Sequence, residues 1–323
     1  MPIDTATISC FGKIPTHGDF VRYHANGPIW QELDRWLQNG FFLAKKRGSL
    51  GEGTRRSCAF VFNPAKAPGA LVGVIRSSRD RSGRHFPFAT GFSTPPIDLK
   101  RMIGMPLRYE AFFKQAACLV REATTGRIDY QDLSQRMEGM RIGPPPDLEA
   151  LNARFQQRTT FKDFVEMLWD HFDDTRKYLL LKNLIDVLRP FRTGSVEDSG
   201  PLHLTYGLKF PLGADRSTVA CQVSFWVECC FRLMHFTGVR PSCFWALPDQ
   251  PEDESPFFIL FLHEPIASIN AFLFVGEDNT DSLFALDNVG RDVAAQVALS
   301  IPPRYGQLLE SDEVTLWRFL RQL

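Results

Sequence analysis

Hydrophobic residues recur every three or four positions in several stretches of the chain, which is the spacing of one face of an α-helix. The first such stripe contains Trp30, Leu33, Leu37 and Phe41. Pro28 precedes it, at the start of a helix, where a missing N–H leaves no helical hydrogen bond unmade. Helices are predicted from residue 28 onwards and over residues 107–121, 160–189, 267–274 and 311–323.

Two of these helices carry signals at their ends. Thr159 or Thr160 can cap the helix that follows by accepting a hydrogen bond from a free N–H of its first turn. Pro190 is expected to end that helix, because proline lacks the N–H of the helical ladder. Ser311 is the predicted cap of the last helix, with Trp317 on its apolar face. We expect that helix to pack on its own domain, although an amphipathic helix can also fill a partner's groove.

Short runs rich in Val, Ile and Phe, bounded by Gly, Pro or Asn, predict strands. Such runs cover residues 57–63, 70–76, 86–93, 242–246 and 256–262. Between residues 202 and 210 every second position is apolar, so one face of a strand there is expected to be buried. Val219–Met234 indicates a buried helix, while its β-branched and aromatic content leaves a strand open.

The order of these elements predicts an α/β protein: a three-layer α/β/α sandwich with a mixed sheet and a helical insertion in the middle of the chain. We divide the chain into an N-terminal α/β part (1–125), the insertion (126–200) and a C-terminal α/β part (201–323) that completes the same domain. Three consecutive prolines within residues 143–147 indicate a stiff connector. The polar residues 193–200 indicate a surface loop.

The composition excludes several classes of protein. Lys plus Arg and Asp plus Glu both number 37, so the net charge gives no reason to expect nucleic acid as a partner. The seven cysteines form no CxxC pair, which favours reduced, buried thiols over a zinc site or disulfides. The first 14 residues lack the apolar region of a signal peptide, and the most apolar run, residues 257–262, is too short to cross a bilayer. We therefore expect a cytoplasmic protein with no membrane insertion.

Two segments are more specific than the rest of the chain. Residues 12–20 read GKIPTHGDF, and residues 78–87 read SRDRSGRHFP, leading into a predicted strand. Between them, residues 34–38 read DRWLQ within the first helix. In order and spacing these segments resemble the TagF family, which is associated with bacterial type VI secretion. The resemblance is strong over residues 8–93 and weaker over residues 243–274.

The two segments can be read as structural. Gly12, Gly18 and Gly83 are expected to allow positive φ angles or close backbone approach. Asp19 and Asp80 can accept hydrogen bonds from loop N–H groups, or pair with arginine. On this interpretation the segments are two turns that hold the first helix against the sheet.

The functional interpretation is that the two loops meet on one face and contact another protein, with basic side chains toward an acidic region of that partner. The candidate partner-binding residues are Lys13, His17, Gly18, Asp19, Phe20, Arg22, Asp80, Gly83, Arg84 and Phe86.

A catalytic alternative uses His17, Asp19, Asp80 and His85 as a metal-dependent hydrolase or phosphatase-like site, because imidazole and carboxylate groups are suitable metal ligands. The spacing gives it little support. The chain has no HExxH pair, no GxSxG nucleophile elbow and no P-loop. We expect neither a metal nor a cofactor.

The resemblance to TagF implies a repressor that acts after translation on type VI secretion. It implies binding to an Fha-type (forkhead-associated) scaffold protein of the apparatus, with no enzymatic step. A structural component of the apparatus is a third possibility.

Overall fold

The computed structural model describes residues 6–46, 56–143, 147–169, 174–192, 204–234, 239–247, 256–276, 281–287 and 301–323. The strands are β1 (Ile8–Gly12), β2 (Val21–Tyr23), β3 (Ser57–Phe62), β4 (Ala70–Arg76), β5 (Phe88–Thr94), β6 (Gly207–Pro211), β7 (Ser242–Leu247), β8 (Phe257–Phe261) and β9 (Leu283–Ala285). The helices up to residue 138 are α1 (Pro28–Lys46), α2 (Leu99–Met102), α3 (Met105–Arg108), α4 (Glu110–Thr124) and α5 (Tyr130–Glu138). The later helices are α6 (Leu148–Arg158), α7 (Phe161–Leu168), α8 (Asp174–Arg192), α9 (Val219–Met234), α10 (Ile269–Val275), α12 (Pro303–Glu310) and α13 (Leu316–Gln322).

One mixed sheet runs through both halves of the chain, in the strand order β2-β1-β5-β4-β3-β7-β8-β6-β9. All neighbours are antiparallel except β6 and β9, which are parallel. The N-terminal and C-terminal halves meet where β3 pairs with β7, with Ala59 opposite Trp245. Since the sheet is continuous across this pair, residues of both halves pack together in the cores on its two faces.

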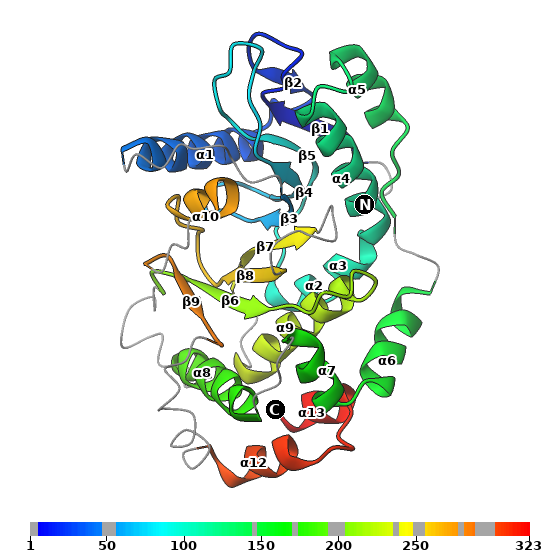
Figure 1. Cartoon of the computed structure of the whole chain (residues 1–323), viewed down its shortest axis with the longest axis vertical. Coiled ribbons are helices and arrows are strands. Elements are labelled where there is room, and N and C mark those ends of the chain that lie inside the picture. The colour runs from blue at the N-terminus through cyan, green and yellow to red at the C-terminus, as the bar shows by residue number, and fades with distance from the viewer. Residues whose placement is uncertain are drawn as a thin grey trace.

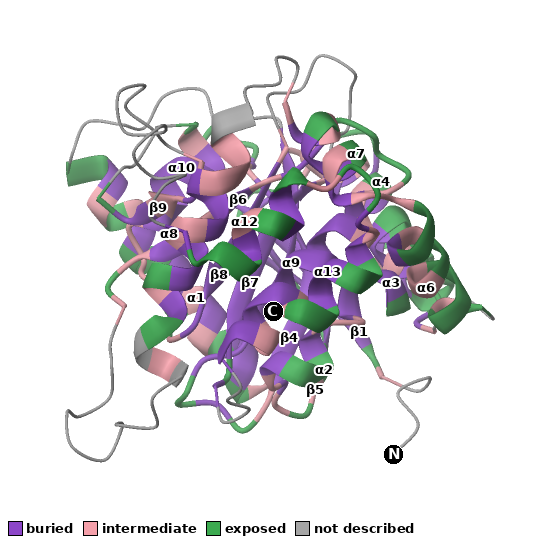
Figure 2. Cartoon of the chain, turned by 90° about the horizontal axis from the view of Figure 1, so that it is seen from below, coloured by how far each residue is buried: buried purple, intermediate pink, exposed green. Residues whose placement is uncertain are grey.

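The sheet is covered on both faces, as the three-layer α/β/α prediction requires. Alternate residues of β3 enter different cores: Phe60 belongs to the core under α1 and α10, and Val61 to the larger core on the other face. Figure 1 shows α1 and α10 on one side of the strands and α4 on the other. Figure 2 shows the strands buried, while the outer sides of α6, α12 and α13 are exposed. Burial on both faces explains why the strands are nearly continuous apolar runs.

The helices predicted from periodicity are present, although the predicted segment 160–189 is divided between α7 and α8 and the predicted start of the last helix is wrong. Thr160 caps α7 in a capping box with Asp163, as expected of one of the two threonines. Helix α8 ends at Arg192, two residues after Pro190 and therefore near the predicted end. Ser311 follows α12, and α13 is capped instead by Thr315, whose hydroxyl accepts a hydrogen bond from the N–H of Arg318.

Other expectations are corrected at single residues or fall outside the described part. The predicted strand at residues 202–210 is shorter and contains Leu208 and Phe210, while residues 201–203 lie outside the described residues, as do 144–146 and 193–200. Trp317 is 42 % exposed rather than packed on the core. Within residues 126–200 the described segments include α5 to α8, and their assignment as an insertion stays a prediction.

The cysteines are free thiols, and five of the seven are buried. Burial raises the pKa of Cys10 to about 12, so this thiol stays protonated at neutral pH. Cys118 is exposed, contrary to the expectation of buried thiols.

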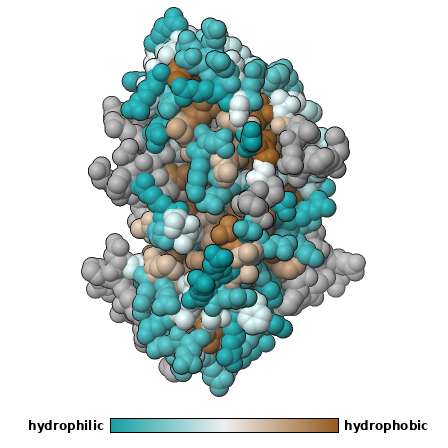
Figure 3. Space-filling model, turned by 90° about the vertical axis from the view of Figure 1, so that its right-hand side faces the viewer, coloured by the Kyte–Doolittle hydropathy of each residue, from teal (hydrophilic) through white to brown (hydrophobic). Residues whose placement is uncertain are grey.

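Within the described ranges, no helix has the length and apolarity needed to cross a membrane. The side formed by α4, α5 and α6 is largely hydrophilic, with separate hydrophobic areas between (Figure 3).

Candidate functional site: two loops joined by Asp80

The two sequence segments form loops that lie against each other. The first loop (residues 13–20) follows β1, and the second loop (residues 77–87) joins β4 to β5. Strands β1 and β5 are antiparallel neighbours with Gly12 opposite Phe88, so the first loop begins beside the end of the second. The N–H of Arg81 donates to the carbonyl oxygen of His17 at 2.9 Å. The topology of the sheet therefore brings the segments together.

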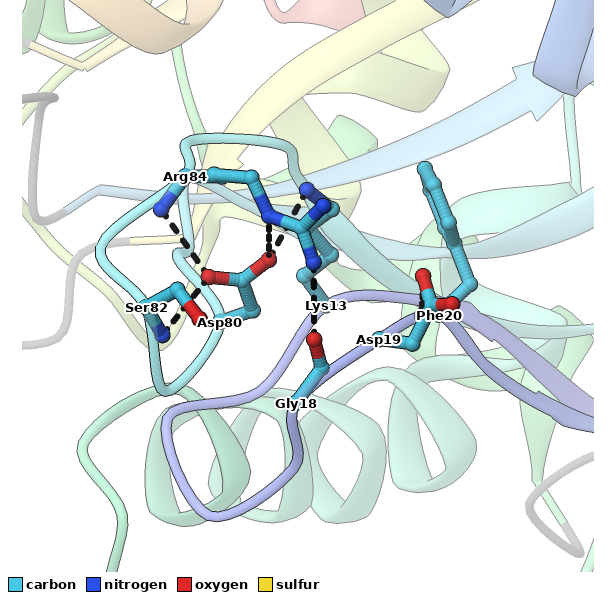
Figure 4. A network of polar contacts seen from close by, with 7 residues as sticks. All are labelled: Lys13, Gly18, Asp19, Phe20, Asp80, Ser82 and Arg84. Carbon is cyan, nitrogen blue, oxygen red and sulfur yellow. Dashed lines mark hydrogen bonds and ion pairs between the residues drawn. The ribbon is translucent and has the colours of Figure 1, made fainter.

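Asp80 is the centre of the contact between the loops (Figure 4). Its side chain is inaccessible to solvent, and Oδ2 lies 3.0 Å from Nζ of Lys13 and 2.7 Å from Nε of Arg84. Its other oxygen, Oδ1, accepts the backbone N–H groups of Ser82 and Arg84, each at 2.9 Å. A buried carboxylate needs such partners, and here they come from both loops.

The partners of Asp80 also set its protonation. Burial alone acts to raise the pKa of this carboxyl group, but the N–H of Arg84 and the side chains of Lys13 and Arg84 outweigh it. The pKa of Asp80 therefore lies well below its ordinary value, and the group is ionised at neutral pH.

Two arginines of the second loop reach across to the first. Nη2 of Arg84 donates to the carbonyl oxygen of Gly18 at 2.7 Å. Nη2 of Arg81 donates to the carbonyl oxygen of Thr16, also at 2.7 Å. The backbone carbonyl groups of the first loop therefore hold both guanidinium groups in place.

An aromatic cluster supports Phe20 at the end of the first loop. The ring of Phe20 stacks on Phe11 at 5.4 Å and meets Phe86 edge to face at 4.9 Å. Nζ of Lys13 lies 5.0 Å from its centroid. Phe20 nevertheless remains 40 % exposed, so an ordered aromatic ring faces solvent beside the Asp80 network.

The glycines of the two segments differ in what they require. Gly12 has φ +137°, and a Cβ there would lie 2.1 Å from the carbonyl oxygen of Pro87. Gly83 has φ +81° in open space, which glycine adopts readily. Gly18 has neither a positive φ nor a neighbouring atom within 4 Å of an added Cβ. The expectation that Gly18 is needed for the backbone is therefore wrong.

The ten candidate residues separate into a buried and an exposed group. Lys13, Asp80 and Phe86 are buried, so these side chains hold the loops together rather than face a partner. The exposed candidates are His17, Gly18, Asp19, Phe20, Arg22, Gly83 and Arg84. The carboxylate of Asp19 accepts the N–H of Phe20 at 2.8 Å.

Sequence reasoning missed Tyr130, the first residue of α5. Its hydroxyl donates to the carbonyl oxygen of Arg22 at 3.3 Å, and its ring lies 6.2 Å from that of His17. The side chain is 38 % exposed. The signal available in the sequence was Asp129, which caps α5 and marks its start, but no local pattern places that start beside β2.

The alternative metal site lacks a suitable arrangement. Both oxygens of Asp80 are occupied by the loop contacts, and its carboxylate is buried beneath Arg84 and Lys13. His17, Asp19 and His85 are exposed. In the part of the chain that the structure describes, three or more His, Cys, Asp or Glu side chains are nowhere grouped to hold a metal ion.

Comparison with known proteins identifies the N-terminal region. Residues 9–140 match the family model described as TagF N-terminal domain, Type VI secretion system-associated. A crystal structure of PA0076 from Pseudomonas aeruginosa PAO1 is similar at 15 % identity and a TM-score of 0.48, covering 86 % of this chain and 98 % of that one. No curated protein matches the chain. Residues 9–140 are therefore similar to the N-terminal domain of TagF, a type VI secretion system-associated family.

Proposed function

We propose that this protein represses type VI secretion after translation, by binding an Fha-type forkhead-associated scaffold protein of the apparatus. The proposed contact is the surface formed by the exposed residues of the two loops. No catalytic step is required, because a protein that binds the free scaffold more tightly than the assembled one shifts the population away from assembly.

The observation that carries this proposal is the exposure of Phe20 on a rigid support. Aromatic residues and arginine dominate the binding energy of protein interfaces. A side chain that is already ordered loses less entropy on binding. The ring of Phe20 packs against Phe11 and Phe86. Arg84, from the second loop, donates a hydrogen bond to the carbonyl oxygen of Gly18, two residues before Phe20.

The engagement of Asp80 supports binding over catalysis. A general base or metal ligand needs a lone pair directed at substrate or metal. The oxygens of Asp80 instead accept from Lys13, from both the side chain and backbone of Arg84, and from Ser82. The carboxylate of this motif therefore organises the loops.

The test is retention of the purified scaffold protein by the tagged chain, with Phe20→Ala compared with Phe42→Ala. Phe42 of α1 is 67 % exposed, so it controls for loss of an exposed phenyl ring outside the two loops. We expect Phe20→Ala to weaken binding at least about tenfold and Phe42→Ala to bind normally, both with wild-type circular dichroism. Failure of the wild-type chain to retain the scaffold would refute the proposal, and full binding by Phe20→Ala would remove this surface.

A further inference from the structure

The exposed surface around the two loops is basic. Its charged side chains outside the Asp80 network include Arg79 and Arg81, and Asp19 is the exposed acid of the first loop. Arg22 also lies on this surface, but its guanidinium group is 3.8 Å from the carboxylate of Asp34 in α1. Asp80 adds no free negative charge, because it is buried against Lys13. The chain as a whole carries equal numbers of acidic and basic residues, so the excess of positive charge here is local.

The guanidinium groups of Arg81 and Arg84 are held by hydrogen bonds to the loops, and each keeps N–H donors that these bonds do not use. Each guanidinium has five N–H donors. Arg81 uses one nitrogen, on the carbonyl of Thr16, and Arg84 uses two, on Asp80 and on the carbonyl of Gly18. Among the described residues the remaining side-chain nitrogens, Nε and Nη1 of Arg81 and Nη1 of Arg84, have no protein partner. They are preorganised donors for an anion.

Aromatic rings border these donors. Phe20 ends the first loop, and Tyr130 reaches the same surface from α5, through its contacts with His17 and Arg22. The hydroxyl of Tyr130 covers the carbonyl of Arg22 on β2, the edge strand of the sheet. An exposed edge carbonyl invites pairing with another strand, and this one already accepts a hydrogen bond.

From these contacts we infer that the surface takes an acidic segment of the partner, whose carboxylates bind the free N–H groups of Arg81 and Arg84 while Tyr130 and Phe20 supply apolar contact. The inference rests on the proposed function for the identity of the partner, but the chemistry of the surface stands on the side chains alone. On this inference Arg81 and Tyr130 belong to the binding surface, and the surface recognises carboxylate groups of the partner.

The direct test titrates a fluorescent oligoglutamate peptide into the full chain and follows its anisotropy. We expect saturable binding that weakens between about 0.1 M and about 1 M salt, where the screening length falls from about 10 Å to about 3 Å. Arg81→Gln should weaken it about tenfold, because a charge-assisted hydrogen bond is lost. Arg318→Gln, an exposed arginine on α13, is the matched control and should stay within about twofold of wild type.

A second measurement separates this inference from the proposed function. The same variants, with Tyr130→Ala, are tested for retention of the Fha-type scaffold protein, and circular dichroism confirms their folding. Retention that is lost in Arg81→Gln and Tyr130→Ala but kept in Arg318→Gln supports both ideas. Full retention by Arg81→Gln and Tyr130→Ala overturns the inference and leaves the proposed function standing.

Oligoglutamate binding without scaffold binding overturns the proposed function alone. Equal weakening of oligoglutamate binding by Arg318→Gln, or no saturable binding by wild type, overturns the inference.

Discussion

Gly40, inside α1, lies so close to Asn270 of α10 that a Cβ at Gly40 would come within 1.7 Å of the side-chain nitrogen of Asn270. That nitrogen donates to the carbonyl oxygen of Trp36 at 3.2 Å. The indole N–H of Trp36 in turn donates to the carbonyl of Pro265 at 2.8 Å. A glycine within a helix thus allows the region that matches the TagF N-terminal domain to pack against a helix of the C-terminal half.

Replacing Gly40 by alanine is expected to destabilise the protein despite the better helix propensity of alanine. The propensity gain is about 1 kcal/mol, and the cost of overpacking is about 1–3 kcal/mol. Because the neighbouring amide is buried and hydrogen-bonded, we expect overpacking to dominate, lowering the free energy of unfolding in urea by about 1–2 kcal/mol. Gly139→Ala is the control, since its Cβ would lie an ordinary 3.5 Å from the nearest atom. A Cβ at Gly40 would also lie 2.5 Å from the carbonyl oxygen of Ala267, so equal stability of wild type and Gly40→Ala would show that both Asn270 and this carbonyl move aside.

Gly12 and Gly18 offer a matched pair within one sequence motif. Gly12→Ala forces a side chain into the backbone of Pro87 at a positive φ, and we expect a loss of about 1–3 kcal/mol in stability. Gly18→Ala meets no atom within 4 Å and should leave the thermal midpoint of unfolding nearly unchanged. Equal destabilisation by both substitutions would show that a side chain at Gly12 is tolerated no worse than one at Gly18.

Regular spacing explains which parts of the fold were predictable. Val219–Met234 was predicted with the observed bounds of α9, because a long buried helix repeats its pattern over several turns. The pairing of β3 with β7, which makes one sheet of both halves, has no local signal in either strand. Single-residue features such as caps depend on where the neighbouring element ends, and Ser311 was misassigned because α12 reaches Glu310.

The sequence allowed the hydrogen-bond partners of the loop aspartate to be predicted, but not which side chains of the site are buried. A loop aspartate that accepts backbone N–H groups or pairs with arginine was expected from turn chemistry, and Asp80 does both. Lys13 was expected at the surface, because lysine is rarely buried unless it is paired. Its partner lies in another loop, so its burial follows only from the pairing of β1 with β5.

The corrected cap of α13 gives a stability prediction. The hydroxyl of Thr315 accepts the N–H of Arg318 at 3.3 Å, so Thr315→Ala should reduce the free energy of unfolding by about 1 kcal/mol. Ser311→Ala should change it by less than about 0.5 kcal/mol, because Ser311 follows α12 and does not cap α13. Urea unfolding of both variants distinguishes the two positions. A larger loss at Ser311 would favour the cap expected from the sequence.

Asp80→Asn should make the protein less stable at neutral pH and less sensitive to acid. The pKa of Asp80 is lower in the folded state than the ordinary value of about 3.9. Its ionised form therefore stabilises the fold fully above that pH, and this contribution is lost as the pH falls toward the folded pKa. Asparagine keeps a hydrogen-bond acceptor for the loop N–H groups but loses the charge that faces Lys13 and Arg84.

The measurement for Asp80→Asn is the difference in urea midpoint between wild type and variant, taken at about pH 7 and again at about pH 3. We expect a clear difference at the higher pH that narrows at the lower one. Other carboxylates titrate equally in both proteins, so the difference isolates Asp80. Asp19→Asn serves as the control, since that exposed side chain accepts one N–H, from Phe20, and should show a small difference. A gap between wild type and Asp80→Asn that stays constant with pH would mean that the charge on Asp80 does not hold the loops together.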